Sequence, residues 1–317
     1  MHGTIKLFSG TGCPDLAGEI SQHLGVNLSG CDIVQFPNEN IFVRLHESIR
    51  GQDVFLIQTT SSPVNYNIME LLISLDALKR ASPDRITVVV PYLSYGRSDR
   101  KDQPRVPITA RLLADMIGVA GADRYILLDL HAAQIQGFFS IPGDVLTVFP
   151  ILADYFREKQ LEQTVVVSAD LGFAKKARNL AAELGLPLAL VEKRRVNSDT
   201  EALTLVGDVE GHDVIIVDEE VDTGGTMINA VNIAREYGAR DVYLCFAHAV
   251  FSPPAPERLS DLSVREIVTT NSIPIPPEKQ LPNLTVLSVA KLLSQVILRV
   301  HEGRSVGEVF RGYRRYE

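Results

Sequence analysis

Cysteine is scarce in this chain. The sequence of 317 residues contains only three cysteines, Cys13, Cys31 and Cys245, and they are scattered and odd in number. A disulfide framework or a cysteine-rich zinc site needs more cysteines at closer, paired spacing. The sequence therefore argues against both, and it predicts buried thiols in a reducing compartment.

Long apolar segments and an excess of basic residues are also lacking. The N-terminal stretch MHGTIKLFSGTG has no extended apolar run, and no apolar stretch reaches the length that spans a membrane. The formal net charge is -8, so the chain has no overall basic footprint of the kind that binds nucleic acid. We expect a cytoplasmic protein whose partners include neither a membrane nor nucleic acid.

Several common catalytic signatures are missing as well. The sequence has no GxxxxGK[ST] motif, which argues against a Walker-type ATPase, and no HExxH, GxSxG or paired CxxC motif. What is present is an ordinary globular composition, with 45% hydrophobic and 22% charged residues. The chain is long enough to form two domains with full cores.

The most informative stretch is 213–226, DVIIVDEEVDTGGT. It begins with an apolar, β-branched run, 214–217, of the kind that forms a buried parallel strand. An acidic loop and a glycine turn follow, and apolar residues then recur at helical spacing. The acids are Asp218, Glu219, Glu220 and Asp222, the turn is Thr223, Gly224, Gly225 and Thr226, and the helical positions are Met227, Ala230, Val231, Ala234 and Tyr237.

This strand, loop and helix have the chemistry of a site for a phosphorylated sugar. Glycines let the backbone approach an anion closely, and the first amides and the dipole of the helix favour negative charge. The acids have the wrong sign for phosphate, so we expect them to hold sugar hydroxyls or Mg²⁺. The alternative is an ordinary strand-to-helix turn with a solvated acidic rim. The density of acids at a strand end, followed by TGGT, favours the binding interpretation.

A faint internal repeat indicates the fold class. GQDVFLI at 51–57 parallels GHDVIIV at 211–217. In each half a loop, an amphipathic helix and a further strand follow, which predicts parallel α/β layers. We expect two similar α/β domains, 1–149 and 150–317, each a mainly parallel sheet flanked by helices, with the option that the last helix packs back on the first domain. The first half has TTSSPVN where the second has the acidic TGGT loop, so only the second should bind the sugar phosphate.

Two basic segments lie outside the repeat. PYLSYGRSDRKDQPR at 91–105 begins where a strand ends, and its arginines can pair bidentately with phosphate oxygens. VEKRRVNSDT at 191–200 is expected to be a mobile loop whose basic residues close over a developing negative charge. For each segment, a solvated basic loop is the alternative.

His131 and Asp170 each follow an apolar strand, in DRYILLDLHAAQIQ and VVVSADLG. A lone histidine is more often structural, but ligands bind at the carboxyl ends of parallel strands. The two side chains could meet there and hold Mg²⁺ or its bound water.

Taken together, these segments resemble the ribose-phosphate pyrophosphokinase family, the phosphoribosyl-diphosphate synthetases, over almost the full chain. The resemblance implies two phosphoribosyltransferase-like domains. It implies transfer of the β,γ-diphosphoryl group of ATP to the C1 hydroxyl of ribose 5-phosphate, with AMP leaving and Mg²⁺ required. It also implies a homo-oligomer, commonly a hexamer. The segments that carry it are FSGTGCPDLAGEI, ESIRGQDVFLIQ, MELLISLDALKRA, PYLSYGRSDRKD, GADRYILLDLHAAQIQGFF, VEKRR, VDEEVDTGGT and LSVAKLL.

The resemblance also implies a role for individual residues. Lys193 and Arg195 match the basic residues that stabilise the transferring diphosphoryl group, and His131 and Asp170 match the metal positions. The positions matching the ribose 5-phosphate site are Arg195, Asp218, Asp222, Thr223, Gly224, Gly225 and Thr226. The positions matching the ATP site are Phe36, Asn38, Glu39, Asn40, Arg97 and Ser98.

The chain departs from the family pattern at several of these segments. Asn40 stands where glutamate is usual, and Ser98 replaces a usual glutamine. Leu171 and Phe173 stand in a segment that is usually small and glycine-rich, and Glu219 replaces a usual aspartate. These departures put nucleotide preference and allosteric control in question.

Two other hypotheses stay open. A catalytically weak regulatory homologue that associates with an active synthetase is favoured by the departures around Asn40 and Asp170, and opposed by Lys193, Arg195 and the intact TGGT turn. A phosphoribosyltransferase that glycosylates a base is opposed by the duplicated domain and by the RSDRKD segment.

Overall fold

The structure of the protein is a computed structural model that describes residues 3–197 and 200–310, with side chains left undescribed over 193–202. It separates into two compact units. Unit 1 runs up to Leu146 and includes Ser272–Pro274 and a C-terminal segment from Ser288. Unit 2 contains Thr147–Asn271 and Ile275–Leu287. The chain divides between Leu146 and Thr147, close to the boundary expected between residues 149 and 150. The last helix belongs to unit 1.

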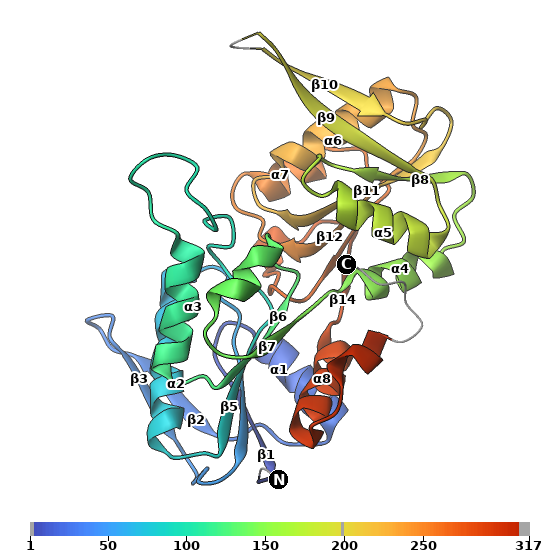
Figure 1. The fold of residues 1–317 in the computed structure, drawn as a ribbon. Helices are drawn as coiled ribbons and strands as arrows, with labels where there is room; N and C mark the ends of the chain where they lie inside the picture. The colour runs from blue at the N-terminus through green and yellow to red at the C-terminus, as the bar shows by residue number, and fades with distance from the viewer. Residues whose placement is uncertain (1–2, 198–199, 311–317) are drawn as a thin grey trace. The chain divides into compact units, whose positions relative to one another are not determined.

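Unit 1 is built on a five-stranded parallel sheet in the order β1-β4-β5-β6-β7. Helices α2 and α3 cover one face and α1 and α8 the other, and a separate antiparallel hairpin, β2–β3, lies against α2 (Figure 1). The bounds are β1 Ile5–Ser9, α1 Pro14–Leu24, β2 Cys31–Gln35, β3 Ile41–Leu45, β4 Asp53–Ile57, α2 Val64–Arg80, β5 Arg85–Val90, α3 Thr109–Ala120, β6 Arg124–Leu128, η1 Ala133–Phe138, β7 Gly143–Leu146, α8 Ala290–Glu302 and η3 Val306–Phe310.

Unit 2 is built on a seven-stranded sheet in the order β10-β9-β8-β11-β12-β13-β14. Only the β9–β10 pair is antiparallel. Helices α4 and α5 pack together, as do α6 and α7 (Figure 1). The bounds are α4 Phe149–Glu158, β8 Thr164–Ser168, α5 Ala174–Leu184, β9 Leu188–Asn197, β10 Thr200–Val206, β11 Asp213–Val221, α6 Gly225–Glu236, β12 Val242–Ala249, α7 Ala255–Ser260, β13 Glu266–Thr270, η2 Pro277–Lys279 and β14 Leu284–Leu287.

The central strands are apolar because helices cover both of their faces. Every residue of β4 and β8 is buried. The amphipathic helix predicted in the first half corresponds to α2. Its apolar residues Ile68, Leu71, Leu75 and Leu78 are buried, whereas Leu72 is only partly buried. The expected fold class, α/β with two mainly parallel sheets flanked by helices, is therefore correct.

The internal repeat corresponds to strands β4 and β11. Each is preceded by a glycine with positive φ, +70° at Gly51 and +69° at Gly211. Each begins with a buried aspartate paired with an arginine, Asp53 with Arg85 at 2.6 Å and Asp213 with Arg240 at 2.7 Å. The repeated sequence therefore forms the same local structure at the N-terminal ends of β4 and β11.

Asp53 also attaches the C-terminal helix to unit 1. Its carboxylate is fully buried and accepts hydrogen bonds from Nε and Nη2 of Arg85 at 2.9 and 2.6 Å. His301 Nδ1 on α8 lies 2.7 Å from Asp53 Oδ2, and Arg85 donates to the carbonyl oxygen of Val300 at 3.0 Å. Helix α8 thus supplies further contacts to the buried Asp53–Arg85 pair at the start of β4, an interior strand of the sheet.

Three local predictions were wrong. Residues 218–220 continue strand β11 and do not form a loop, because they pair with β12 as far as Val221. Residues 193–195 lie on β9, where β10 satisfies their backbone groups, and not in a loop. Tyr237 follows the end of α6 and is 41% exposed, so it does not belong to the buried face of that helix.

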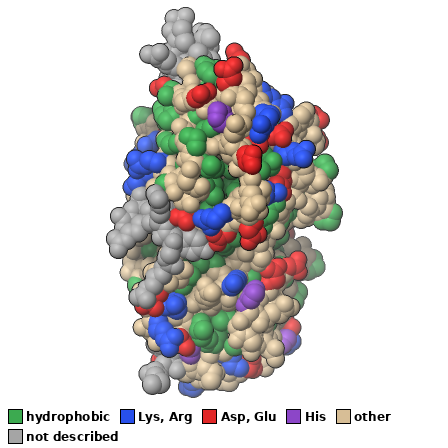
Figure 2. Space-filling model, turned by 90° about the vertical axis from the view of Figure 1, so that its right-hand side faces the viewer, with side chains coloured by type: hydrophobic (Ala, Val, Ile, Leu, Met, Phe, Trp, Pro, Cys, Tyr) green, Lys and Arg blue, Asp and Glu red, His purple; other side chains and the backbone are tan. Residues whose placement is uncertain are grey.

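The surface and the helices give two further observations. On the face shown in Figure 2, basic and acidic side chains are interspersed. Among the described residues, no helix combines the length and the apolar character needed to cross a membrane.

Candidate functional site

The turn between β11 and α6 presents backbone amides at the carboxyl edge of the unit 2 sheet. Gly224 has φ +80°, a left-handed conformation that favours glycine, and Gly225 begins the helix. The Gly224 carbonyl accepts the Ile228 amide at 2.9 Å, so the helical ladder starts at this point. The amides of the first turn have no partner within the helix, and together with the helix dipole they suit an anion. The predicted glycine turn at the start of a helix agrees with the structure, and anion binding by this turn stays a prediction.

The acids before this turn divide between two faces of β11. Side chains alternate along a strand, so Asp218 and Glu220 lie on one face and Glu219 on the other. Asp218 and Glu220 are half-buried, whereas Glu219 is 5% exposed. Glu219 accepts a hydrogen bond from Lys176 Nζ on α5. Glu219 is therefore not placed to bind ligand beside Asp218, and the half-buried Asp222 follows the strand end.

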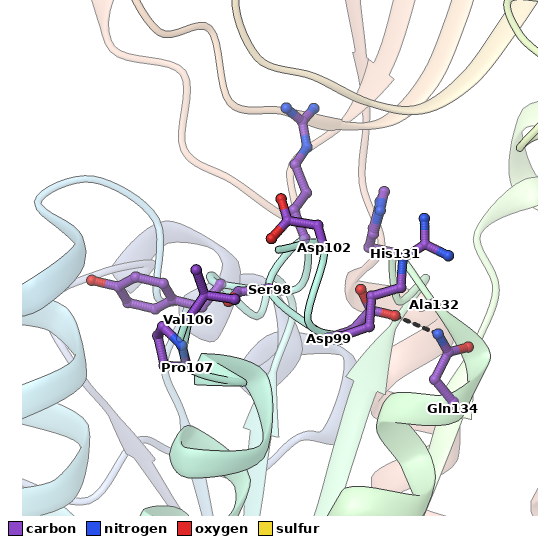
Figure 3. Close-up of a pocket in the computed structure, with 11 residues that line it drawn as sticks. Ser98, Asp99, Asp102, Val106, Pro107, His131, Ala132 and Gln134 are labelled. Atoms are coloured by element: carbon purple, nitrogen blue, oxygen red, sulfur yellow. Dashed lines mark hydrogen bonds between the residues drawn. The ribbon is translucent and has the colours of Figure 1, made fainter. Parts of the chain in front are cut away.

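In unit 1, the arginine-rich segment after β5 lines an open cavity of about 720 Å³. Three residues singled out from two sequence segments, Arg97, Ser98 and His131, all line it. Figure 3 labels Ser98 and His131 in this cavity. The lining residues are Tyr95, Arg97, Ser98, Asp99, Arg100, Asp102, Val106, Pro107, His131, Ala132 and Gln134. The cavity combines two arginines, an imidazole and carboxylates, a mixture suited to a polyphosphate with its cation.

Ser98 has a second contact that its position in the motif did not reveal. Its hydroxyl lies 3.2 Å from Oγ1 of Thr109 and accepts the Thr109 amide at 3.4 Å. Thr109 is the first residue of α3, so Ser98 helps to satisfy the free amides at that helix start. The predicted role of Ser98 at the nucleotide stays a prediction, and the hydroxyl is shared with the helix.

Asp99 and Gln134 are cavity residues that the sequence interpretation missed. Asp99 is 8% exposed, and Gln134 Nε2 donates to its Oδ2, as Figure 3 shows. This bond joins the segment after β5 to η1, which follows His131. The sequence does not predict this hydrogen bond, because the spacing of residues does not indicate which loops meet. The polar character of the two segments is the only indication of a contact between them.

The candidate metal residues occupy different units. His131 is exposed at the cavity of unit 1, and Asp170 is half-buried in unit 2, where its Oδ1 accepts the Phe173 amide at 3.0 Å. Within the described residues, no group of three or more His, Cys, Asp and Glu side chains could hold a metal ion. Mg²⁺ commonly takes one or two protein carboxylates and completes its shell with water and substrate phosphates. The residues present fit an ion of that kind, and the shared site remains a prediction.

The expected adenine segment forms the turn of the β2–β3 hairpin. The amides of Phe36 and Glu39 close the turn, donating to the carbonyls of Asn40 and Phe36, each at 2.8 Å. Asn38 Oδ1 accepts the Asn40 amide at 3.3 Å, and all four residues are exposed. None of them lines the cavity of Arg97 and His131. The structure thus does not unite the two predicted parts of the ATP site.

The two expected catalytic residues, Lys193 and Arg195, are described only in their backbone. They lie on β9, opposite Leu203 and Glu201 of β10. Their side chains lie outside what the structure describes, so their catalytic role remains a prediction.

The cysteines are poorly suited to nucleophilic chemistry. Cys13 and Cys245 are fully buried as predicted, and Cys31 is half-buried. Burial raises the pKa of Cys13 to about 12, and it raises the pKa of Cys245 strongly as well. A thiol reacts as the thiolate, so neither buried cysteine is an available nucleophile near neutral pH.

A parallel α/β sheet whose acidic strand enters a glycine-capped helix defines a phosphoribosyltransferase-like protein. Residues 5–121 match the family model for the N-terminal domain of ribose phosphate pyrophosphokinase, and residues 194–311 match the phosphoribosyl synthetase-associated domain. The chain therefore belongs to the ribose-phosphate pyrophosphokinase family.

Individual relatives agree with this assignment over nearly the whole chain. The ribose-phosphate pyrophosphokinase of Bacillus subtilis is 48% identical over 96% of this chain and 97% of its own length. That of Caldanaerobacter subterraneus is 47% identical over 97% and 98% of the two chains. The crystal structure of phosphoribosylpyrophosphate synthetase from Mycobacterium smegmatis has a TM-score of 0.91 at 44% identity, covering 95% of this chain and 99% of that one.

Proposed function

We propose that this chain transfers the β,γ-diphosphoryl group of ATP to the C1 hydroxyl of ribose 5-phosphate, forming 5-phosphoribosyl 1-diphosphate and AMP. The observation that carries the proposal is the acidic end of β11 running into the glycine-capped start of α6, in a chain of this family. This arrangement places carboxylates, which can accept hydrogen bonds from sugar hydroxyls, next to backbone amides, which can donate hydrogen bonds to phosphate. A ligand that is a sugar phosphate requires both.

In the proposed complex, unit 2 binds ribose 5-phosphate. The 5-phosphate accepts hydrogen bonds from the turn of Thr223, Gly224, Gly225 and Thr226, where the helix dipole favours its charge. Asp218 and Asp222 accept hydrogen bonds from the ribose hydroxyls. These contacts fix the sugar so that its C1 hydroxyl can approach the nucleotide.

Unit 1 binds ATP in the same proposal. Arg97 and Arg100 line the cavity with His131, and both arginines are exposed, so their guanidinium groups can reach phosphate oxygens. Phe36, Asn38, Glu39 and Asn40 are proposed to contact adenine from the β2–β3 turn. Asn40 offers an amide oxygen to the adenine amino group, a weaker acceptor than a carboxylate.

The reaction needs positioning and charge stabilisation more than covalent help from the protein. The C1 hydroxyl oxygen forms a bond to the β-phosphorus of ATP and gives up its proton to water, the bond from the β-phosphorus to the α-phosphate oxygen breaks, and AMP leaves with that oxygen. Lys193 and Arg195 are proposed to donate to the transferring group as its charge shifts. When bound, Mg²⁺ would neutralise phosphate charge, and His131 and Asp170 are the residues proposed to hold it.

We also propose a cytoplasmic homo-oligomer, with a hexamer as the expected state. Exposed apolar residues on α3 support association, because Leu112 is 56% and Val119 79% exposed. Light scattering of the purified protein measures the state directly, and a monomer at micromolar concentration would contradict this part of the proposal.

The test of the activity is direct. Purified protein is incubated with ATP, Mg²⁺ and ribose 5-phosphate, and AMP and phosphoribosyl diphosphate are measured. Formation of both in equal amounts supports the proposal. No product from the protein alone, but a change in the rate of an active synthetase when it is added, would support a regulatory homologue. Release of diphosphate from phosphoribosyl diphosphate and a free base would indicate a phosphoribosyltransferase.

A further inference from the structure

The loop that carries Asp170 is fixed at the start of α5. Asp170 Oδ1 accepts the backbone amide of Phe173 at 3.0 Å, and Ser168 Oγ donates to the Asp170 carbonyl at 2.7 Å. Asp170 Oδ2 makes no hydrogen bond among the described residues. The carboxylate is therefore held by one oxygen and can offer the other to a ligand, provided that the first turn of α5 keeps its place.

Phe173 anchors that turn in the apolar interior of unit 2. Its side chain is 5% exposed, and its ring lies 5.4 Å from the ring of Phe149 at the start of α4. Lys176, one turn further along α5, has Nζ 5.6 Å from the centre of the Phe173 ring. The aromatic ring thus packs against α4 on one side and limits the path of the lysine on the other.

Lys176 crosses from α5 to the acidic strand. Its ammonium group donates to Oε2 of Glu219, whose side chain is only 6% exposed, against 37% for Lys176. Glu219 lies on the same face of β11 as Ile215 and Val217, opposite Asp218. A buried carboxylate needs such a partner because it has lost most of its hydration.

We propose that Lys176 is a positioning residue that couples the two predicted ligand-binding carboxylates of unit 2, Asp170 and Asp218. It neutralises Glu219 directly behind Asp218, and it holds the first turn of α5, on which the orientation of Asp170 depends. This inference rests on the proposed function for the identity of the ligand. Phe173 and Glu219, which are both departures from the family pattern, are connected through their contacts with Lys176.

Removal of Lys176 would have a specific consequence. Glu219 would lose the ammonium group that neutralises its charge, next to the residue proposed to bind ribose hydroxyls. That charge would oppose the approach of the dianionic ribose 5-phosphate. A neutral residue at 219 would relieve the effect even without Lys176, and this distinguishes charge compensation from simple packing.

The experiment measures ribose 5-phosphate binding by calorimetry, without nucleotide, in Lys176→Met, Glu219→Gln and the double variant. Lys175→Met is the matched control, because Lys175 is exposed on the same helix. We expect Lys176→Met to weaken binding about tenfold or more, since it removes the cation that is paired with a buried carboxylate. We expect the double variant to recover most of this loss and Lys175→Met to resemble the wild type.

Two results would overturn the inference: equal affinities for Lys176→Met and Lys175→Met, or no recovery in the double variant. If Lys176→Met does not fold, judged by thermal unfolding, Lys176→Arg and Glu219→Gln decide. The arginine variant should bind normally because it keeps the cation, and weak binding by it would count against the inference. A wild type that binds ribose 5-phosphate but forms no AMP contradicts only the proposed function. A wild type that does not bind ribose 5-phosphate contradicts both.

Discussion

The β4–α2 and β11–α6 connections start alike and end differently. Each strand begins with a buried aspartate that pairs with arginine, and a glycine and one variable residue precede that aspartate. Strand β4 then stops after five residues, whereas β11 continues for nine. The longer strand carries its acidic residues out to the glycine turn, so the additional length is what presents them at the sheet edge.

The first connection uses its polar atoms internally. Thr60 Oγ1 donates to the Tyr92 carbonyl at 2.9 Å and Thr59 Oγ1 to the Ser272 carbonyl at 3.2 Å. Gln58 Nε2 donates to buried Glu70 at 2.9 Å. Pro63, before α2, has no amide hydrogen to offer.

The second connection has a glycine at the equivalent place, and its helix amides are available. The comparison teaches how a duplicated scaffold can differ: the first connection uses its polar groups to hold unit 1 together, and the second leaves the first amides of α6 open to the proposed ligand.

The largest effect is expected at a feature that unit 1 lacks, the β9–β10 addition to the parallel sheet. Lys193→Ala and Arg195→Ala should each lower kcat by about a hundredfold, or about 3 kcal/mol, because the lost contact acts on the transition state. KM for ribose 5-phosphate should change much less. Steady-state kinetics of both variants check this, and unchanged turnover in both would remove the segment from the mechanism.

The two repeated aspartates should differ in their effect on stability. Asp53→Ala leaves Arg85 and His301 without their buried partner, and a cost of about 3 kcal/mol is expected for breaking such a pair. Asp213→Ala should cost less, because Arg240 is 52% exposed and can be solvated. Chemical denaturation of both variants gives the free energies of unfolding. Equal losses would mean that the two strand starts are energetically equivalent.

Asp222→Asn tests the division of substrates between the units. The amide keeps the size of the side chain but removes the charge, so ribose 5-phosphate binding should weaken by about 2 kcal/mol, or about thirtyfold. ATP binding should stay nearly unchanged, since the segments proposed to bind ATP belong to unit 1. Separate titrations with each ligand measure this, and equal weakening of both would contradict the division.

The smallest effect concerns the glycine turn. Gly224→Ala forces a side chain into a left-handed conformation, which costs about 1 kcal/mol and should weaken ribose 5-phosphate binding about fivefold. Gly225→Ala is the matched control, because a Cβ there meets nothing within 4 Å. If the two variants bind alike, the positive φ of Gly224 is not what shapes the site.

Much of the fold could be predicted because it depends on short-range patterns. The apolar runs of β4 and β11 and the repeated Gly-x-Asp start identify parallel strands from neighbouring residues alone. The end of β11 could not be found in this way. Asp218 and Glu220 look like loop residues, and only their pairing with β12 keeps them in the strand. The same holds for 193–195, whose partner strand lies further along the chain.

The candidate site was predictable in its local parts and not in its pairings. The TGGT turn follows from glycine geometry and helix chemistry, which need no distant residue. The bond from Gln134 to Asp99, and that from Lys176 to Glu219, join segments that are far apart in sequence. Strand alternation could have shown that Glu219 faces away from Asp218, but nothing in the sequence specified Lys176 as its partner.

The attachment of α8 to Asp53 has a consequence for the order in which the protein can be made. Unit 1 begins at the N-terminus, yet its buried carboxylate meets His301 only after α8 has left the ribosome. The last strand of unit 2, β14, ends at Leu287, before that helix is synthesised. During translation, the second half of the chain can therefore finish folding first, and the half that emerged earliest must wait for the last helix.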